Sequence, residues 1–246
     1  RILDGITLDI AEGEFATVVG PNGAGKSTLV KCINGLQKIS CGTLKVLNTD
    51  VTNSFSPILG RKIGYVPQRC DIDRRFPASV FDVVSIGRFG AMGLFGRLTK
   101  DDREIIYSSM GEAGIPHLSC RPIGHLSGGE FQKVLIAKLL AQRSGIMLFD
   151  EPTSNLDIKS QNDIIRIIES IYLEKKPTVV FITHLLSHIP RCSGKIILMK
   201  DGRIAACGGP DDVFREETLS YLYDCRVEIT TVNGKKHFHV AGEHII

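Results

Sequence analysis

Short apolar runs alternate along the chain with longer stretches in which apolar residues recur every three or four positions. The short runs predict buried strands, at residues 15–19, 62–66, 146–149, 179–183 and 196–199. The helical spacing predicts helices, at residues 26–35, 101–113, 129–142 and 158–173. Apolar side chains share one face of the last helix, namely Ile164, Ile168, Ile171 and Tyr172. Strands that alternate with helices predict an α/β fold in which helices pack on a sheet.

Three further patterns extend this plan. Residues 6–10 alternate between apolar and polar, which predicts a half-buried strand. Between residues 68 and 125 the strand character fades and helix-forming stretches prevail, which predicts a helical insertion. Lys200-Asp201-Gly202-Arg203 and the pair Asn233-Gly234 are typical of hairpin turns. We therefore expect the chain to end in a small β appendage.

Composition excludes several classes of protein. A chain of 246 residues that is 43% apolar can bury a sizeable core. The net charge of +3 and the scattered Lys and Arg residues do not predict a nucleic-acid partner. Seven widely spaced cysteines without a C-x-x-C pair are typical of reduced thiols in the cytosol. No apolar run approaches the roughly 20 residues of a membrane span, and no signal peptide is visible. The chain begins at Arg1 directly before a strand-like stretch, so we expect part of the natural N-terminus to be missing.

A glycine-rich turn between the first buried strand and the first helix predicts a phosphate site. It fits G-x-x-x-x-G-K-[ST] in full, as Gly20-Pro21-Asn22-Gly23-Ala24-Gly25-Lys26-Ser27. Glycines let backbone N–H groups turn inward, and the helix N-terminus adds positive potential. Lys26 is expected to reach the β and γ oxygens, and the Ser27 hydroxyl to ligate Mg²⁺.

Two acids follow the buried strand at residues 146–149. Asp150 emerges at the C-terminal edge of that strand, where ligands collect in parallel sheets. Because side chains alternate along a strand, we expect Asp150 and Glu151 to point differently. One acid can then serve a metal ion while the other faces an attacking water.

A second glycine turn, Leu126-Ser127-Gly128-Gly129-Glu130, opens a predicted helix. Ser127 and Glu130 fit a capping box. The box does not explain two glycines in the first turn, which weaken a helix by up to about 1 kcal/mol each relative to alanine. Bare N–H groups at a helix start suit the close approach of an anion. Since the first turn already holds this chain's phosphates, we expect the second to meet the γ-phosphate held by another copy.

Taken together, these features resemble the ATP-binding subunit of an ABC transporter, and the likeness covers nearly the whole chain. The two turns are its Walker A and signature motifs, and the strand-end acids are its Walker B motif. Three more motifs occur in the family's order, the Q-loop Tyr65-Val66-Pro67-Gln68, the D-loop Ser154-Asn155-Leu156-Asp157 and the switch histidine in Ile182-Thr183-His184. The joint pattern is specific to this family.

The resemblance implies the family's architecture. The expected fold is the P-loop NTPase core, a mixed sheet flanked by helices, with an antiparallel β part and a helical insertion. It implies a single ABC ATPase domain over residues 1–246. Its expected parts are a core ATP-binding subdomain of residues 1–68 and 126–225, a helical subdomain of residues 69–125 and a C-terminal β appendage of residues 226–246.

The resemblance also implies that ATP and Mg²⁺ bind at the interface of a head-to-tail dimer. Each ATP lies between the Walker A motif of one copy and the signature motif of the other. The nucleotide-binding residues carried over are Gly20, Pro21, Asn22, Gly23, Ala24, Gly25, Lys26, Ser27 and Thr28. The signature residues that act on the other copy's ATP are Leu126, Ser127, Gly128, Gly129 and Glu130.

Catalytic roles follow from the same resemblance. Glu151 is expected to be the general base, His184 to contact the γ-phosphate together with Lys26, and Gln68 to sense Mg²⁺ and the attacking water. The expected Mg²⁺ ligands are Ser27, Gln68 and Asp150, the last through a water molecule. Asp157 is expected to link the two sites of the dimer.

Two departures from the family pattern stand out. Leu185 follows the switch histidine, where members commonly have Asp, so one local polar contact is in doubt. The family's adenine-stacking aromatic residue precedes the first strand, and this chain begins too late to contain it.

The resemblance implies a permease partner that docks on residues 69–125, at the cytoplasmic face of the cell membrane, and a solute-binding protein. Part of the insertion, from Arg74 to Arg88, resembles importers of metal cations and of iron chelates, and residues 93–98 resemble the zinc and manganese group. Residues 219–223 also resemble siderophore and haem importers. Metal-cation import is the favoured hypothesis, and iron-chelate import is the alternative. Two other classes fit less well. A non-transport ABC ATPase usually has two cassettes or a long coiled-coil insertion, whereas this sequence shows one cassette and a short insertion. An exporter cassette is often fused to membrane spans, and none is visible in this sequence.

Three histidines near the C-terminus suggest one more hypothesis. His237 and His239 share one face of a predicted strand, and His244 follows. A regulatory metal site is one interpretation. Solvated histidines in a tail are the other, because no acidic or cysteine ligand accompanies them.

Overall fold

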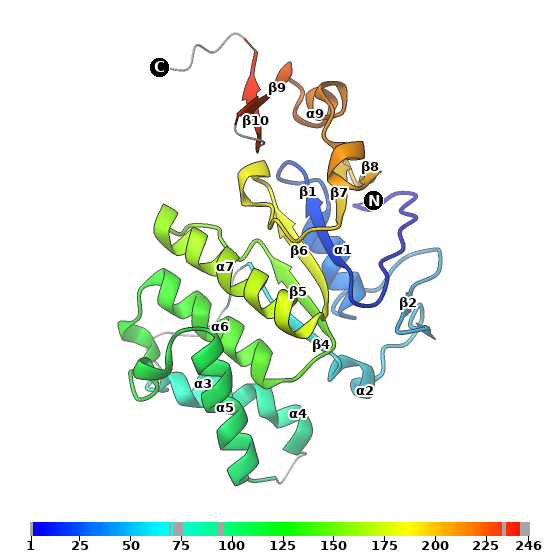
Figure 1. The fold of residues 1–246 in the computed structure, drawn as a ribbon. Helices are drawn as coiled ribbons and strands as arrows, with labels where there is room; N and C mark the ends of the chain where they lie inside the picture. The colour runs from blue at the N-terminus through cyan, green and yellow to red at the C-terminus, as the bar shows by residue number, and fades with distance from the viewer. Residues whose placement is uncertain (1, 69, 71–75, 93–95, 233–234, 242–246) are drawn as a thin grey trace.

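A six-stranded sheet forms the centre of the computed structural model, which describes residues 2–68, 70, 76–92, 96–232 and 235–241 (Figure 1). The strand order is β4-β5-β6-β1-β7-β8. The strands are β1 Phe15–Val19, β4 Ile63–Val66, β5 Ile146–Asp150, β6 Thr178–Thr183, β7 Lys195–Lys200 and β8 Arg203–Gly208. Neighbouring strands are parallel except β7 and β8, which pair antiparallel around the predicted turn. The sheet is therefore mixed, as predicted.

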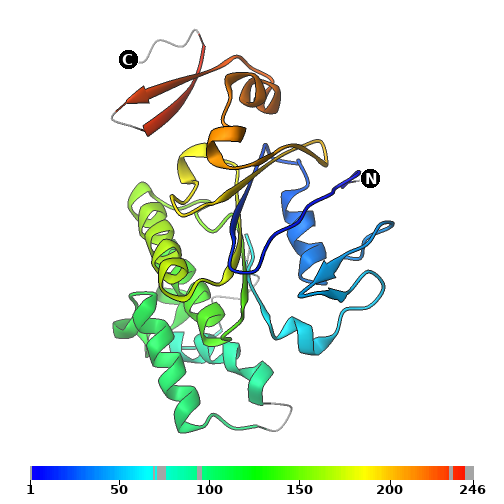
Figure 2. The same cartoon turned by 45° about the vertical axis from the view of Figure 1, so that its right-hand side comes forward.

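Helices cover both faces of this sheet. Helix α1, Lys26–Ile33, lies on one face, and α6, Gly128–Ala141, and α7, Ile158–Lys175, lie on the other (Figure 2). Side chains of β5 alternate between these layers, since Phe149 joins the core on the α6 and α7 side and Leu148 the core on the α1 side. Burial on both faces explains why the strands are continuous apolar runs.

Helix α7 shows how local sequence sets an element's bounds. Asp157 caps its start by accepting a hydrogen bond from the Ser160 backbone N–H at 3.0 Å. Its buried residues are Ile164, Ile168 and Ile171, which confirms the predicted apolar face. The helix ends at Lys175, and the following residue, Lys176, caps it with a left-handed φ of 49°.

The predicted helical insertion is confirmed. It contains α3 Val80–Ser85, η1 Ile86–Arg88, α4 Phe89–Met92, α5 Lys100–Glu112, η2 Pro116–Leu118 and η3 Ile123–His125. Arg88 joins it to α6, because its guanidinium donates to Asp102 within the insertion at 2.9 Å and to the backbone oxygen of Ala141 in α6 at 2.9 Å. Thr99 is the N-cap of α5 and forms a capping box with Asp102. The hydrogen bonds that the Asp102 carboxylate accepts from Thr99 and Arg88 lower its pKa to about 2.

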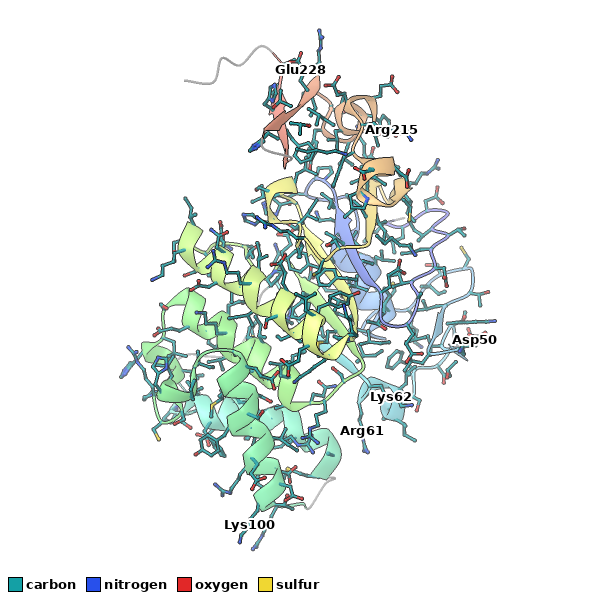
Figure 3. All side chains as sticks on the ribbon, viewed as in Figure 1. Asp50, Arg61, Lys62, Lys100, Arg215 and Glu228 are labelled. Carbon is teal, nitrogen blue, oxygen red and sulfur yellow. The ribbon has the colours of Figure 1, made fainter. Side chains whose placement is uncertain are left out.

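Smaller elements complete the chain. They are β2 Lys45–Val46, β3 Thr49–Asp50, α2 Pro57–Gly60, η4 Leu186–His188, α8 Pro210–Val213, α9 Glu216–Tyr223, β9 Val227–Val232 and β10 Lys235–Val240. β9 and β10 pair antiparallel, which confirms the predicted hairpin, although its turn residues 233–234 lie outside the described residues. Glu228 in this hairpin and Lys100 at the start of α5 lie at opposite ends of the molecule (Figure 3).

The strand predicted at residues 6–10 is wrong. The segment carries no strand assignment, although Ile6, Leu8 and Ile10 are half-buried against the core on the α1 side while Thr7 and Asp9 are exposed. The alternation therefore reports packing of an extended segment, and no described strand pairs with it.

Candidate nucleotide site

Glycine is required by the backbone of the Walker A turn between β1 and α1. A Cβ at Gly20 would lie 2.1 Å from the Met199 carbonyl oxygen, so the turn lies directly on the end of β7. Gly23 and Gly25 have φ values of 85° and 94°, in the left-handed region that glycine adopts readily. The Leu29 N–H then donates to the Gly25 oxygen at 2.9 Å and begins the helix. The first N–H groups of α1 consequently face the turn.

Lys26 spans this turn. Its ammonium donates to the backbone oxygens of Gly20 and Pro21, at 2.8 and 2.9 Å, and lies 3.6 Å from Glu151 Oε1. The residue is only 4% exposed. Burial lowers the pKa of Lys26, and the nearby Glu151 carboxylate partly opposes that shift. A positive charge is thus held at the turn, where it can attract phosphate oxygens.

Ser27, Asp150 and Tyr65 form an oxygen-rich cluster beside the turn. The Ser27 hydroxyl donates to Asp150 Oδ1 at 2.8 Å, and the Tyr65 hydroxyl donates to Oδ2 at 3.2 Å. Burial raises the pKa of Asp150, and these two hydrogen bonds oppose the shift. Hydroxyl and carboxylate oxygens are the ligands that Mg²⁺ prefers, usually one or two carboxylates together with substrate phosphates. The donor set therefore fits Mg²⁺, although the sequence did not point to Tyr65 as a partner of Asp150.

Glu151 is the point at which three predicted site residues meet. Its Oε2 accepts from Gln68 Nε2 at 2.8 Å and lies 3.1 Å from His184 Nδ1, while Lys26 approaches Oε1. Gln68 follows β4, Glu151 follows β5 and His184 follows β6, and these three strands are parallel neighbours. Their carboxyl ends lie at one edge of the sheet, beside the turn after β1.

The divergence of Asp150 and Glu151 has a different cause from the one predicted. Strand β5 ends at Asp150, and Glu151 has a left-handed φ of 48°. Its N–H donates to the Ile182 oxygen at 3.1 Å, which holds this turn against β6. Such a conformation costs a non-glycine residue about 1–3 kcal/mol and is typical of functional sites. The backbone turn, rather than strand alternation, aims the two carboxylates apart.

The signature turn forms the predicted capping box. Glu130 N–H donates to the Ser127 hydroxyl oxygen at 3.2 Å, and Ser127 N–H donates to Glu130 Oε2 at 2.8 Å. The hydrogen bonds that the Glu130 carboxylate accepts from the backbone and the side chain of Ser127 lower its pKa. A Cβ at Gly129 would lie 2.5 Å from Ser160 Oγ, and one at Gly128 would lie 3.2 Å from Leu156. Close packing against α7 is therefore a second reason for glycine at position 129.

Asp157 and Ser160 connect the D-loop to this turn. Besides the capping bond, the Ser160 hydroxyl donates to Asp157 Oδ2 at 2.6 Å, and both bonds lower the pKa of Asp157. Ser160 thus touches the D-loop acid and faces Gly129 at once. The D-loop and signature turn form one packed corner of the chain.

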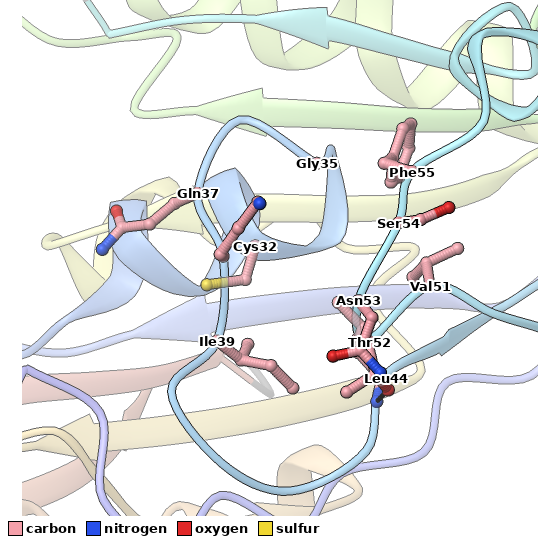
Figure 4. Close-up of a pocket in the computed structure, with 11 residues that line it drawn as sticks. Cys32, Gly35, Gln37, Ile39, Leu44, Val51, Thr52, Asn53, Ser54 and Phe55 are labelled. Atoms are coloured by element: carbon pink, nitrogen blue, oxygen red, sulfur yellow. Dashed lines mark hydrogen bonds between the residues drawn. The ribbon is translucent and has the colours of Figure 1, made fainter.

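Other candidate features lie apart from these contacts. A cavity of about 400 Å³ lies between the end of α1 and the loop after β3, and no phosphate-motif residue lines it (Figure 4). His239 Nε2 lies 3.6 Å from Glu228 Oε2, and His244 is outside the described residues. Among the residues that the structure describes, no three His, Cys, Asp or Glu side chains gather to hold a metal ion. None of the helices in the described ranges combines the length and apolar character needed to cross a membrane.

Relatives of known sequence match nearly the whole chain. A family model described as ABC transporter matches residues 3–154. An uncharacterised ABC transporter ATP-binding protein of Methanocaldococcus jannaschii is 37% identical, over 95% of this chain and 90% of that protein. The manganese transport system ATP-binding protein MntB of Listeria innocua is 35% identical, over 90% of this chain and 89% of its own. The ferric enterobactin transport ATP-binding protein FepC of Escherichia coli is 32% identical, over 93% and 83%.

Solved structures of similar fold agree. An inward-facing ABC transporter assigned to the metal-chelate type has a TM-score of 0.81 at 26% identity, over 95% of this chain and 88% of that chain. A dimeric bacterial ABC transporter cassette has a TM-score of 0.74 at 29% identity, over 85% and 90%. A post-hydrolysis dimer with ADP and Pi has a TM-score of 0.72 at 28% identity, with the same coverage. Because the family model spans more than half of the chain and the relatives match nearly all of it, the chain belongs to the ABC transporter family as an ATP-binding subunit with ATPase activity.

Proposed function

We propose that this chain hydrolyses MgATP with Glu151 as the general base. The observation that carries the proposal is the meeting of Lys26, Gln68 and His184 at the Glu151 carboxylate. A carboxylate held by neighbours of this kind can accept a proton from a water molecule within hydrogen-bond reach. His184 would then contact the γ-phosphate, and Gln68 would orient the water. Residues 20–28 would bind the phosphates.

Ser27, Gln68 and Asp150 would hold Mg²⁺, with Asp150 acting through a water molecule. When bound, the ion would bridge phosphate oxygens and neutralise charge that develops on them. The hydrogen bond between Ser27 and Asp150 supports this assignment because it already brings two of the oxygen groups together.

The working unit in this proposal is a head-to-tail dimer of two copies. Residues 126–130 of one copy would contact the γ-phosphate held by the other, and Asp157 would link the two sites. The capping of α6 by Ser127 supports the proposal, since the first N–H groups of a helix can bind an anion. The dimeric cassettes among the similar structures support it as well.

A membrane permease would dock on residues 69–125. This docking would hold the chain at the cytoplasmic face of the membrane. Among the described residues of this segment, four large apolar side chains are exposed, Phe76, Ile86, Phe89 and Tyr107. Exposed apolar surface of this kind fits a protein partner. The division into a core of residues 1–68 and 126–225, a helical subdomain of residues 69–125 and an appendage of residues 226–246 belongs to this proposal.

For the cargo, we propose import of metal cations such as zinc or manganese, delivered by a solute-binding protein. The manganese transport relatives support this choice. Import of an iron chelate is the second candidate, supported by the ferric enterobactin relative and by residues 219–223. Residues 74–75 and 93–95, part of the basis for the first choice, lie outside the described residues. Uptake of manganese and of a ferric siderophore, in cells with and without this chain, separates the two candidates.

The Glu151→Gln variant tests the proposed mechanism. It removes the base but keeps a side chain of the same shape, so ATP should still bind while turnover falls by at least about 10²-fold. The ATP-bound dimer should therefore accumulate, which size-exclusion chromatography with MgATP detects. Near-normal phosphate release by this variant would show that Glu151 is not the base.

A further inference from the structure

His188 lies on the same loop as the switch histidine but has a different partner. It ends the short helix η4, and its Nδ1 lies 3.0 Å from the Thr153 hydroxyl oxygen. Thr153 is 3% exposed and follows Glu151 by two residues. A side-chain contact therefore joins the loop of His184 to the turn of Glu151.

The other described hydrogen bonds of this loop are mostly internal. Leu185 N–H donates to Thr183 Oγ1 at 3.1 Å, and His188 N–H donates to the Leu185 oxygen at 3.1 Å. These bonds shape the loop but do not connect it to the turn after β5. Leu185 has no hydrogen-bonding side chain with which to make that connection. His188 connects the two segments through Thr153, in addition to the direct contact of His184 with Glu151.

The two connected segments depend on each other's position. The Glu151 carboxylate lies 3.1 Å from His184 Nδ1, so a shift of either loop alters this contact. Strands β5 and β6 are paired as far as Asp150 and Ile182, and the Glu151 N–H also donates to the Ile182 oxygen. The side chains of Glu151 and His184 lie beyond that pair, so strand pairing alone does not fix their separation. Burial, with the neighbouring His184, lowers the pKa of His188. The neutral imidazole that this favours can accept a hydrogen bond from the Thr153 hydroxyl at Nδ1.

We propose that His188 is a positioning residue for ATP hydrolysis, which acts through Thr153 to hold the turn of Glu151 against the loop of His184. It acts on turnover rather than on nucleotide binding, because the hydrogen bond of His188 is made to Thr153, next to the Glu151 turn, whereas the described contacts of Lys26 and Ser27 are made by other residues. The proposal rests on the proposed role of Glu151 as the base.

Steady-state hydrolysis of MgATP by the full chain tests this inference, together with binding of a fluorescent ATP analogue and thermal unfolding. His188→Ala and Thr153→Val each remove one end of the contact. His188→Asn places an amide where Nδ1 lies and Thr153→Ser keeps the hydroxyl, whereas His188→Gln carries its amide further out. His237→Ala, at an exposed position on β10, is the matched control.

We expect His188→Ala and Thr153→Val each to lower kcat about tenfold, equivalent to about 1.4 kcal/mol of activation free energy, with KM changed less than about twofold. His188→Asn and Thr153→Ser should keep most of kcat, and His188→Gln should not. The double variant should be no slower than either single variant, because both remove the same contact.

Three results would each overturn the inference. They are full activity of His188→Ala, losses that multiply in the double variant, and equal activity of His188→Asn and His188→Gln. If His188→Ala unfolds at the assay temperature, the kcat of His188→Asn compared with that of His188→Gln tests the contact. The Glu151→Gln and His188 variants separate the two roles. Normal hydrolysis by Glu151→Gln removes the proposed function itself, whereas an inactive Glu151→Gln beside fully active His188 variants removes only the role of His188.

Discussion

Gly129 offers a direct test of the packing between the signature turn and α7. In Gly129→Ala, the new Cβ would lie 2.5 Å from Ser160 Oγ and 2.9 Å from Ser160 Cβ. Both distances are well below the optimal separation of non-bonded carbon atoms, which is about 3.5–4.0 Å. The serine hydroxyl cannot move freely, because it donates to Asp157 at 2.6 Å. The start of α6 must therefore shift away from α7.

The expected size of the effect follows from two opposing contributions. Overpacking of a tight contact costs about 1–3 kcal/mol, and alanine recovers up to about 1 kcal/mol relative to glycine in a helix. We expect a net loss of about 1–2 kcal/mol in the free energy of unfolding. Urea unfolding followed by circular dichroism measures it.

A matched control lies in α5. A Cβ at Gly111 would meet no atom within 4 Å, so Gly111→Ala should stabilise the protein by about 0.5–1 kcal/mol. Ser160→Gly removes the obstructing atoms, so the loss caused by Gly129→Ala should shrink in that background. If Gly129→Ala stabilises the protein as Gly111→Ala does, the reasoning about this contact is refuted.

Two further predictions concern the signature turn and the helical insertion. Ser127→Arg should leave nucleotide binding to the monomer largely intact and stop ATP-driven dimerisation, as measured by size-exclusion chromatography. Loss of monomer binding would contradict the action of this turn on the other copy's ATP. Asp102 has a pKa lowered from 3.8 to about 2 by folding, so its contribution to stability is present above pH 4 and is lost as the pH falls towards 2. Asp102→Asn should therefore lower the melting temperature at pH 7, and the difference from wild type should shrink towards pH 2; a constant difference would contradict this linkage.

Local sequence predicted most elements because their patterns are short-range. Helix α7 was expected at residues 158–173 and occupies Ile158–Lys175, since its capping residue and its apolar spacing lie within the segment itself. Strand β5 was expected at residues 146–149 and ends one residue later. Residues 6–10 show the limit of this reasoning, because alternation indicates one buried face and cannot supply a hydrogen-bonded neighbour.

The reason for glycine in the signature turn was only partly visible in the sequence. Exposed N–H groups at a helix start suggested an anion, and that hypothesis stands as a proposal. The close approach of Gly129 to Ser160 depends on how α6 packs against α7, and these residues are far apart in the sequence. The contact of His188 with Thr153 cannot be predicted from the sequence for the same reason, because the two residues are 35 positions apart and no motif contains His188.

The Walker A turn, the buried strands and the acids at the end of β5 can be predicted from sequence, because each depends on residues that are adjacent or one helical turn apart. Which side chains meet depends on the arrangement of the strands in the folded chain. Gln68 and Glu151 are separated by 83 positions, and Glu151 and His184 by 33. They meet because the strand order places β4, β5 and β6 side by side, so their carboxyl ends share one edge. The left-handed turn at Glu151 then aims its carboxylate at both partners, and a backbone conformation of that kind is set by the hydrogen bond to the neighbouring strand.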